Sequence, residues 1–156
     1  MYKAAVRWLI RRNIHQLNLG NYRPALAMFH KDATLAFPGE NRWASQHRPV
    51  EKRREAFATH RGRDEIEAFL RSYVSGGFQM EVEDILVNGP PWNLRAAVRV
   101  HDWVAGDGAE DRYSNRAVLF VTAAWGKLRT QEDYEDTERA AAFDHLLTQE
   151  EKTVTQ

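Results

Sequence analysis

The hydrophobic period of this sequence changes between its two halves, and no other feature restricts the fold as strongly. In the first half, apolar residues recur every three or four positions, as in the stretches from Ala5 to Leu17 and from Ile66 to Val74. In the second half, apolar and polar residues alternate, most clearly from Leu94 to Val104. The first pattern is typical of helices and the second of half-buried strands. Helices followed by antiparallel strands predict the α+β class.

Turn residues divide the two halves into elements. Gly20 ends the first expected helix, a second begins at Asn21, and a third runs from about Arg63 to Gly76. A last helix is expected over residues 137–147, and strands over residues 33–37, 78–87, 94–104, 113–123 and 127–134. We therefore expect one domain over residues 1–149 and a frayed polar tail over residues 150–156.

A basic insertion at about residues 39–61 is longer than most connections in a compact domain. It holds six cations (Arg42, Arg48, Lys52, Arg53, Arg54 and Arg61) against three acids, Glu40, Glu51 and Glu55. We expect a solvated helix or loop here, or a lid over a pocket. A nucleic-acid patch is disfavoured because aromatic residues do not alternate with the cations. The acidic stretch from Glu132 to Glu138 could be the electrostatic partner of this insertion.

Charge and cysteine content exclude several function classes. Lys plus Arg and Asp plus Glu number 22 each, so no net charge draws the chain to nucleic acid or to an anionic membrane. The absence of cysteine excludes disulfides and thiolate zinc sites, and it fits a reducing cytoplasm. Arg7, Arg11 and Arg12 interrupt the apolar N-terminal stretch, which argues against a signal peptide or a membrane span. We expect a cytoplasmic protein with no nucleic-acid or membrane partner.

Five short segments carry a resemblance to a known family. They are Leu17–Tyr22, Ala27–Thr34, Gly62–Ile66, Trp125–Leu128 and Tyr134–Asp136. With them the chain resembles the nuclear transport factor 2 (NTF2)-like superfamily, and most closely its SnoaL-like branch. The resemblance implies an α+β roll in which a cone-shaped, curved antiparallel sheet wraps around about three helices and encloses a deep pocket. It also implies a homodimer through the outer sheet face. Members include isomerases, cyclases, epoxide hydrolases and proteins without catalysis.

The stretch from Leu94 to Val104 supports a pocket independently of the resemblance. Side chains alternate between the two faces of a strand, so Asp102 shares a face with Val100 and three further apolar residues, Leu94, Ala96 and Val98. An apolar wall with one acid is typical of a small-molecule pocket. The opposite face carries Arg95, Arg99, His101 and Trp103, a mixture suited to an interface or to solvent.

Ketosteroid-isomerase-like members use an Asp base, a Tyr and a second acid. The position of the base, just before Pro38, holds Phe37 in this sequence, and the position of the Tyr holds Asn13. Only Asp102 falls on the second acid. We therefore do not expect steroid isomerisation.

Epoxide-hydrolase-like members use two Asp residues bridged by an Arg. Asp102 and Asp133 match the two acids, but Val100 replaces the Arg. In SnoaL-like cyclases, an acid near the position of Asp133 transfers protons during ring closure. His101 is a candidate for the accompanying His, although its parity points outward.

Each candidate residue has a structural alternative. Burial of Asp102 would raise its pKa and suit proton transfer, whereas the same residue could cap the turn at Gly106. Asp133 could be a solvated surface acid. Tyr113 and Asn115 would place a hydroxyl and an amide at the pocket mouth, or bond neighbouring loops. Val100, Phe37 and Asn13 would complete the substrate-binding wall.

No histidine has metal-ligand spacing and no phosphate loop is present, so we expect no metal and no cofactor. The sequence thus predicts a pocket for an apolar small molecule. The protein is then expected to be one of two things. It is a cofactor-free acid/base enzyme of cyclase, isomerase or epoxide-hydrolase type, or it is a ligand-binding or dimerisation module without catalysis.

Overall fold

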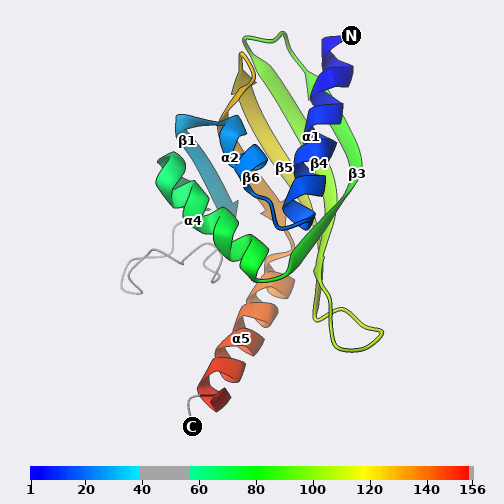
Figure 1. Ribbon diagram of the computed structural model, residues 1–156, viewed down its shortest axis with the longest axis vertical. Helices are drawn as coiled ribbons and strands as arrows, with labels where there is room; N and C mark the ends of the chain where they lie inside the picture. Colours follow the sequence, from blue (N-terminus) through cyan, green and yellow to red (C-terminus); the bar gives the residue numbers. More distant parts are fainter. Residues whose placement is uncertain (39–56, 155–156) are drawn as a thin grey trace.

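The computed structural model describes residues 1–38 and 57–154. Three helices, α1 (Tyr2–Asn18), α2 (Arg23–Met28) and α4 (Gly62–Ser75), lie on one face of a curved sheet, and a fourth, α5 (Thr137–Val154), projects from its end (Figure 1). The strands are β1 (Phe29–Pro38), β2 (Phe57–Arg61), β3 (Phe78–Asn88), β4 (Leu94–Val104), β5 (Tyr113–Ala124) and β6 (Lys127–Glu135). The α+β class predicted from the sequence is confirmed.

The six described strands form one sheet in the order β2-β1-β6-β5-β4-β3. Neighbours pair antiparallel except β1 and β6, which run parallel. The sheet is therefore mixed, whereas the sequence led us to expect an antiparallel one. The difference arises because α4 carries the chain from β2 at one edge to β3 at the other. The antiparallel meander from β3 to β6 then leads back across the sheet to β1. Because each strand of the meander reverses direction, β6 arrives beside β1 running parallel to it.

Helix α1 lies along the edge strand β3 and is held there by side-chain bonds to its backbone. Asn18 Nδ2 donates to the Met80 carbonyl at 2.8 Å, and the Met80 N–H donates to Asn18 Oδ1 at 2.9 Å. Arg7 and Arg11 donate to the Ile85 and Val82 carbonyls. Covering an edge strand in this way satisfies backbone groups that would otherwise be free to pair with another chain.

The C-terminal helix differs from the sequence expectation. We expected it to end near Leu147 and the chain to fray from residue 150, but α5 continues to Val154. Ala140 and Phe143 are buried and anchor its first turns. Arg112 Nη2 lies 2.5 Å from Glu150 Oε2 in an ion pair that holds a later turn. Glu and Lys are also good helix formers, so the polar composition that suggested fraying is compatible with a helix.

Two other expectations are not decided by the fold. Residues 39–56 of the basic insertion lie outside the described residues, so its role as a lid stays a prediction, and residues 57–61 form β2. None of the described helices has the length and apolar character that a membrane crossing requires. A cytoplasmic location stays a prediction.

The outer face of the sheet is the surface on which we predict a homodimer. His101 stacks on Trp103 with ring centroids 5.3 Å apart, and Glu83 pairs with Arg99 at 2.9 Å and Arg116 at 3.2 Å. A central aromatic residue surrounded by Arg is typical of interface cores. We expect sedimentation velocity to show a dimer that Trp103→Glu converts to a monomer.

The matched control for this experiment is Trp8→Glu, because Trp8 is exposed on α1, away from the outer sheet face. This control should leave the dimer intact. A wild-type monomer, or a dimer that persists in Trp103→Glu, would contradict the predicted interface.

Candidate active site

A cavity of about 450 Å³ lies between the helices and the concave face of the sheet. Most of its lining is apolar and comes from α1, α2, α4 and the strands β1, β3, β4, β5 and β6. A few polar side chains also line it: Tyr2, Asn13, Tyr73, Asp102, Tyr113, Gln131, Asp133 and Glu135. A mostly apolar cavity of this size with a few polar groups is typical of small-molecule sites.

Asp102 lies on the cavity side of β4, as the alternation of that strand predicted. The burial of β4 alternates along its length, and Asp102 is only 8% exposed. Burial raises the pKa of Asp102 to about 6, although its own backbone N–H and the neighbouring His101 act in the opposite direction. Its Oδ1 has no hydrogen-bond partner among the described residues. The hydrogen bond that affects its pKa comes from its own backbone N–H and not from the Gly106 turn, and Asp102 lines the cavity.

Asp133 lies on β6 and is also 8% exposed. Burial raises its pKa to about 8; a hydrogen bond from Gln131 Nε2 to Oδ1, at 2.9 Å, lowers the pKa in part, and the charges of Glu135 and Asp102 raise it further. Mutual repulsion is one way in which two acids in one pocket can separate their pKa values. In the structure, burial is the largest cause and the charge of Asp102 a small one. At neutral pH, Asp133 keeps its proton while Asp102 is mostly ionised.

The two acids line one cavity at different levels. Asp102 pairs with Asn115 of β5, whereas Asp133 pairs with Leu119, so they lie two strands apart and are offset by four residues. With strands about 4.8 Å apart and a rise of about 3.3 Å per residue, a flat sheet would separate their Cα atoms by roughly 16 Å. Both acids lie two residues before the C-terminal ends of β4 and β6, which run in the same direction. The register of the two strand pairs nevertheless places them at two separate levels of the cavity.

Tyr73 is a polar group of the cavity that the sequence analysis missed. Its ring is buried on α4, and its hydroxyl has no hydrogen-bond partner among the described residues. Burial, together with the charges of Asp102 and Asp133, raises the pKa of Tyr73 well above its usual value, so the hydroxyl stays protonated. The helical period from Ile66 to Val74 predicts that Tyr73 is buried. A hydroxyl at a buried position was the feature of the sequence that could have marked it as a candidate site residue.

Glu135 is a second missed residue. It lies on the cavity side of β6 opposite Ala117, which in turn pairs with Val100 of β4. Glu135 is therefore two residues nearer than Asp133 to the level of Asp102. Glu135 belongs to the acidic stretch that we considered as a partner of the basic insertion, because alternation alone does not show which face of a polar strand is covered.

Three of the predicted wall residues, Asn13, Phe37 and Val100, line the cavity. The ring of Phe37 lies against Phe69, with centroids 4.8 Å apart, so an apolar ring stands where an isomerase of this fold would need its base. Tyr113 also lines the cavity, and burial raises its pKa, which keeps this hydroxyl protonated.

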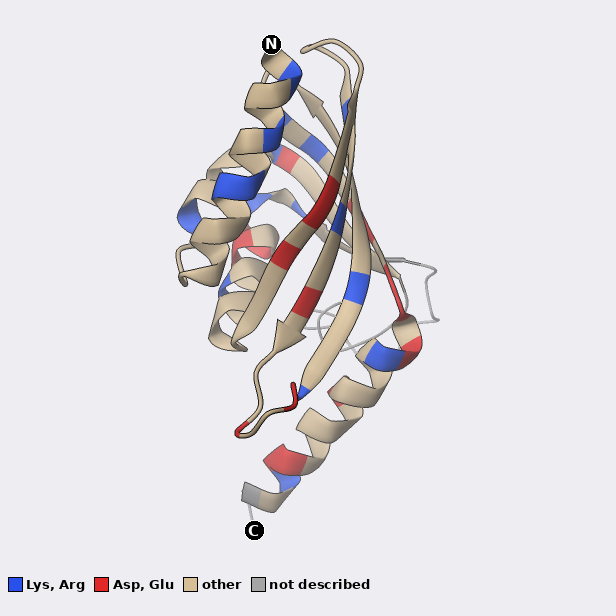
Figure 2. Ribbon diagram, turned by 90° about the vertical axis from the view of Figure 1, so that its right-hand side faces the viewer, with Lys and Arg blue, Asp and Glu red and all other residues tan. Residues whose placement is uncertain are grey.

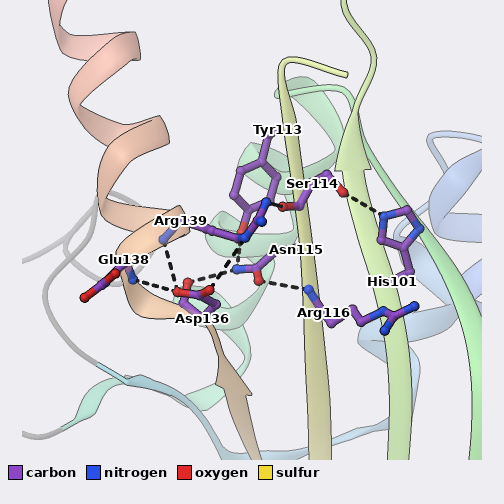
Figure 3. A network of polar contacts seen from close by, with 8 residues as sticks. All are labelled: His101, Tyr113, Ser114, Asn115, Arg116, Asp136, Glu138 and Arg139. Carbon is purple, nitrogen blue, oxygen red and sulfur yellow. Dashed lines mark hydrogen bonds and ion pairs between the residues drawn. The ribbon is translucent and has the colours of Figure 1, made fainter. Parts of the chain in front are cut away.

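The prediction for Asn115 was wrong, because this residue is not part of the cavity lining. Its Nδ2 donates to Tyr113 Oη at 2.9 Å and to the Asp136 carbonyl at 3.0 Å, and its Oδ1 accepts from the Arg116 N–H (Figure 3). Every polar atom of its amide is thus used within the protein. Asn115 ties Tyr113 to the start of α5 and positions that hydroxyl.

The described residues contain no group of three His, Cys, Asp or Glu side chains that could hold a metal ion. Among the groups that line the cavity are the carboxyls of Asp102, Asp133 and Glu135 and the protonated phenols of Tyr73 and Tyr113. Such a set can accept a proton at one point and donate protons at others.

Comparison with known proteins identifies the class of fold. No protein-family model and no curated protein matches the chain. Bal32a, from a soil-derived mobile gene cassette, is 16% identical with a TM-score of 0.62, over 88% of this chain and 95% of Bal32a. An NTF2-like protein from Burkholderia xenovorans is 17% identical with a TM-score of 0.55, over 88% and 93% of the two chains.

A protein of cystatin-like fold from Methylobium petroleophilum is 15% identical with a TM-score of 0.60, over 85% of this chain and 76% of that one. A curved, unclosed sheet around helices with an internal cavity is the NTF2-like fold, and this chain has it. Identities this low extend the likeness to the fold alone. The SnoaL-like branch stays a prediction.

Proposed function

We propose that the chain is a cofactor-free acid/base enzyme that acts on an apolar small molecule held in the cavity. The observation that carries this proposal is the pair of buried carboxyls in one apolar cavity, with a pKa of about 6 for Asp102 and about 8 for Asp133. Groups with separated pKa values near neutrality are the arrangement that general acid/base catalysis requires.

The roles follow from the protonation states. At neutral pH, the Asp102 carboxylate accepts a proton from the substrate. The protonated Asp133 and the Tyr73 hydroxyl donate to oxygen as negative charge develops there. Donors already fixed in a cavity stabilise such charge without reorganisation of solvent. Asp102 takes up one proton and Asp133 gives up one, so exchange of one proton with solvent by each group restores both to their starting states before the next turnover.

The positions of the two acids favour one reaction class over another. Epoxide opening requires both carboxyls around one three-membered ring and its attacking water, and Val100 occupies the place of the bridging Arg. An offset of four residues on strands β4 and β6 instead suits proton transfers at two separated atoms of the substrate. An isomerisation or an aldol-type ring closure has this requirement. Steroid isomerisation by the known three-residue set is not expected, because Phe37 and Asn13 replace two of its parts.

A second candidate function is ligand binding without catalysis. The composition of the lining favours this candidate, because no described Lys, Arg or His lines the cavity and its acid/base groups are limited to carboxyls and phenols. Both candidates require an apolar ligand, but only the enzyme requires the carboxyls. A screen of apolar enones and polyketide-like ketones, with a steroid enone included, separates them by turnover. We expect turnover of a non-steroid ketone, whereas binding of every ketone without turnover of any would support the second candidate.

Filling the cavity should abolish ligand binding in either case. Ala117 is buried on the cavity wall, and in Ala117→Phe the added ring occupies empty space instead of displacing packed atoms. We expect at least about tenfold weaker binding of the neutral fluorescent probe N-phenylnaphthylamine. The matched control is Ala97→Phe, which adds the same ring on the opposite face of β4. Equal affinity of the two variants would place the probe outside this cavity.

A further inference from the structure

Two exposed tryptophans meet at the end of the molecule opposite to α5. Trp92 lies in the connection between β3 and β4 and Trp125 in the turn between β5 and β6, and both turns lie at the same end as the N-terminus (Figure 1). Their ring centroids are 5.8 Å apart, and the residues are 59% and 73% exposed. We call Gly89–Asn93, Trp125, Gly126 and the first residues of α1 the tip.

The backbone of the tip presents Trp125 at a conformational cost. Trp125 has φ +52° and Gly126 φ +77°, so both central residues of this two-residue turn are left-handed. Such hairpin turns favour Asn-Gly, and a bulky residue with positive φ is an outlier. The Trp125 N–H donates to the Pro91 carbonyl at 2.8 Å, and Tyr2 Oη donates to the Gly89 carbonyl. The three segments of the tip are therefore fixed to one another, and strain held at an exposed aromatic residue points to a use for it.

The tip is also locally cationic, although the whole chain is neutral. Residues 1–31, 85–101 and 117–131 contain no Asp or Glu. Lys3, Arg95, Lys127 and Arg129 lie within a few residues of the tip, and none pairs with a carboxylate in the described part of the chain. Figure 2 shows basic and no acidic segments at the end that carries the N-terminus, with the acids farther along the strands. The expectation of no membrane partner rested on net charge, which conceals this local asymmetry.

The cavity extends to the tip. Pro91 and Gly126, the sequence neighbours of the two tryptophans, line the cavity together with Tyr2. An apolar ligand dissolves poorly in water and is concentrated in lipid. A fixed pair of tryptophans beside such a cavity, surrounded by cations, has the composition of a membrane-interface contact.

We propose that the tip docks on an anionic lipid surface, with Trp92 and Trp125 in the interfacial layer, and that the apolar ligand enters the cavity from there. Docking itself does not require catalysis. The entry of ligand rests on the proposed function, because it assumes that the cavity holds an apolar molecule.

Flotation of the full chain with vesicles tests the docking. We expect wild-type protein to float with vesicles of equal parts phosphatidylcholine and phosphatidylglycerol, to float less as salt is raised, and to float poorly with phosphatidylcholine alone. The double variant Trp92→Ser, Trp125→Asn should partition about tenfold or more weakly. Asn-Gly is the favoured sequence for this turn, so the variant should fold at least as well as the wild type.

Trp8→Gln is the matched control, since Trp8 is 63% exposed on α1 but lies outside the tip, with its ring against Arg12. It should float like the wild type. Three results would overturn the docking: no flotation of the wild type, equal flotation of the double variant, or equal loss in Trp8→Gln. Association of the chain without vesicles that disappears in the double variant would assign the tip to a second copy instead.

Binding of N-phenylnaphthylamine separates this inference from the proposed function. Probe binding without vesicle binding contradicts only the docking. Vesicle binding without probe binding contradicts only the cavity as a ligand site.

Discussion

Asp133→Asn is expected to unfold at higher urea than the wild type at pH 8, and at nearly the same urea at pH 4. The folded protein raises the pKa of Asp133 from 3.8 to about 8, so between these values the native state binds a proton that the unfolded state has lost. Stability must then fall as pH rises through this window, by up to about 1.4 kcal/mol per pH unit for one group. The loss is complete above the folded pKa and absent below the unfolded one.

The magnitude makes this the largest stability effect that we expect. When this loss is summed from the unfolded pKa of 3.8 to the folded pKa of about 8, Asp133 alone lowers the stability of the wild type by roughly 5 kcal/mol at pH 8. Asp102, whose pKa rises to about 6, adds a smaller loss that is complete above about that pH. In the Asp133→Asn variant, the new side-chain amide would stay neutral throughout. Replacement of the exposed acid Asp111 by Asn is the control and should leave the pH dependence unchanged. A wild-type stability that is flat from pH 4 to pH 8 would refute the burial of both carboxyls.

Asp102→Asn is expected to lower turnover by about a hundredfold to ten-thousandfold, the usual cost of losing a proton-transfer group. Asn is nearly isosteric with Asp, so binding of the substrate should change little and the loss should appear in kcat. In the wild type, the rate should rise as Asp102 ionises near pH 6 and fall as Asp133 loses its proton near pH 8. Turnover requires the first group charged and the second neutral, which gives a bell-shaped profile.

The variants should change this profile one side at a time. Asp102→Asn should remove the rise near pH 6, and Asp133→Asn should remove the fall near pH 8. Asp84→Asn is the control, because Asp84 lies on β3 and is not part of the cavity lining. Unchanged kcat in Asp102→Asn would leave this protein as a ligand-binding module of the same fold.

Local patterns predicted those parts of the fold and site that depend on one strand or helix. The alternation from Leu94 to Val104 placed Asp102 on the covered face, and the helical period placed the buried side of α4. The parallel pairing of β1 with β6 could not be predicted in this way, because it joins strands about a hundred residues apart. The four-residue offset between Asp102 and Asp133 depends on the registers of two strand pairs, which no single segment encodes.

The errors at individual residues have the same origin. Asn115 has the parity of a cavity residue, but its amide is taken up by Tyr113 and Asp136 from other positions in the fold. The helical period from Ile66 to Val74 includes Tyr73, but only the tertiary structure shows that its hydroxyl lacks a partner among the described residues and that Tyr73 lines a cavity. The strands expected over residues 113–123 and 127–134 leave Trp125-Gly126 between them, whereas the contact of Trp125 with Trp92 depends on how two hairpins lie side by side.

The central claim is that two carboxyls buried in one cavity titrate separately around neutral pH. Carbon-13 NMR of the side-chain carboxyls, with Asp102→Asn and Asp133→Asn used to assign the signals, measures this directly. We predict midpoints near pH 6 for Asp102 and near pH 8 for Asp133. The claim would be contradicted if both carboxyls titrated near the usual aspartate value of about 3.9.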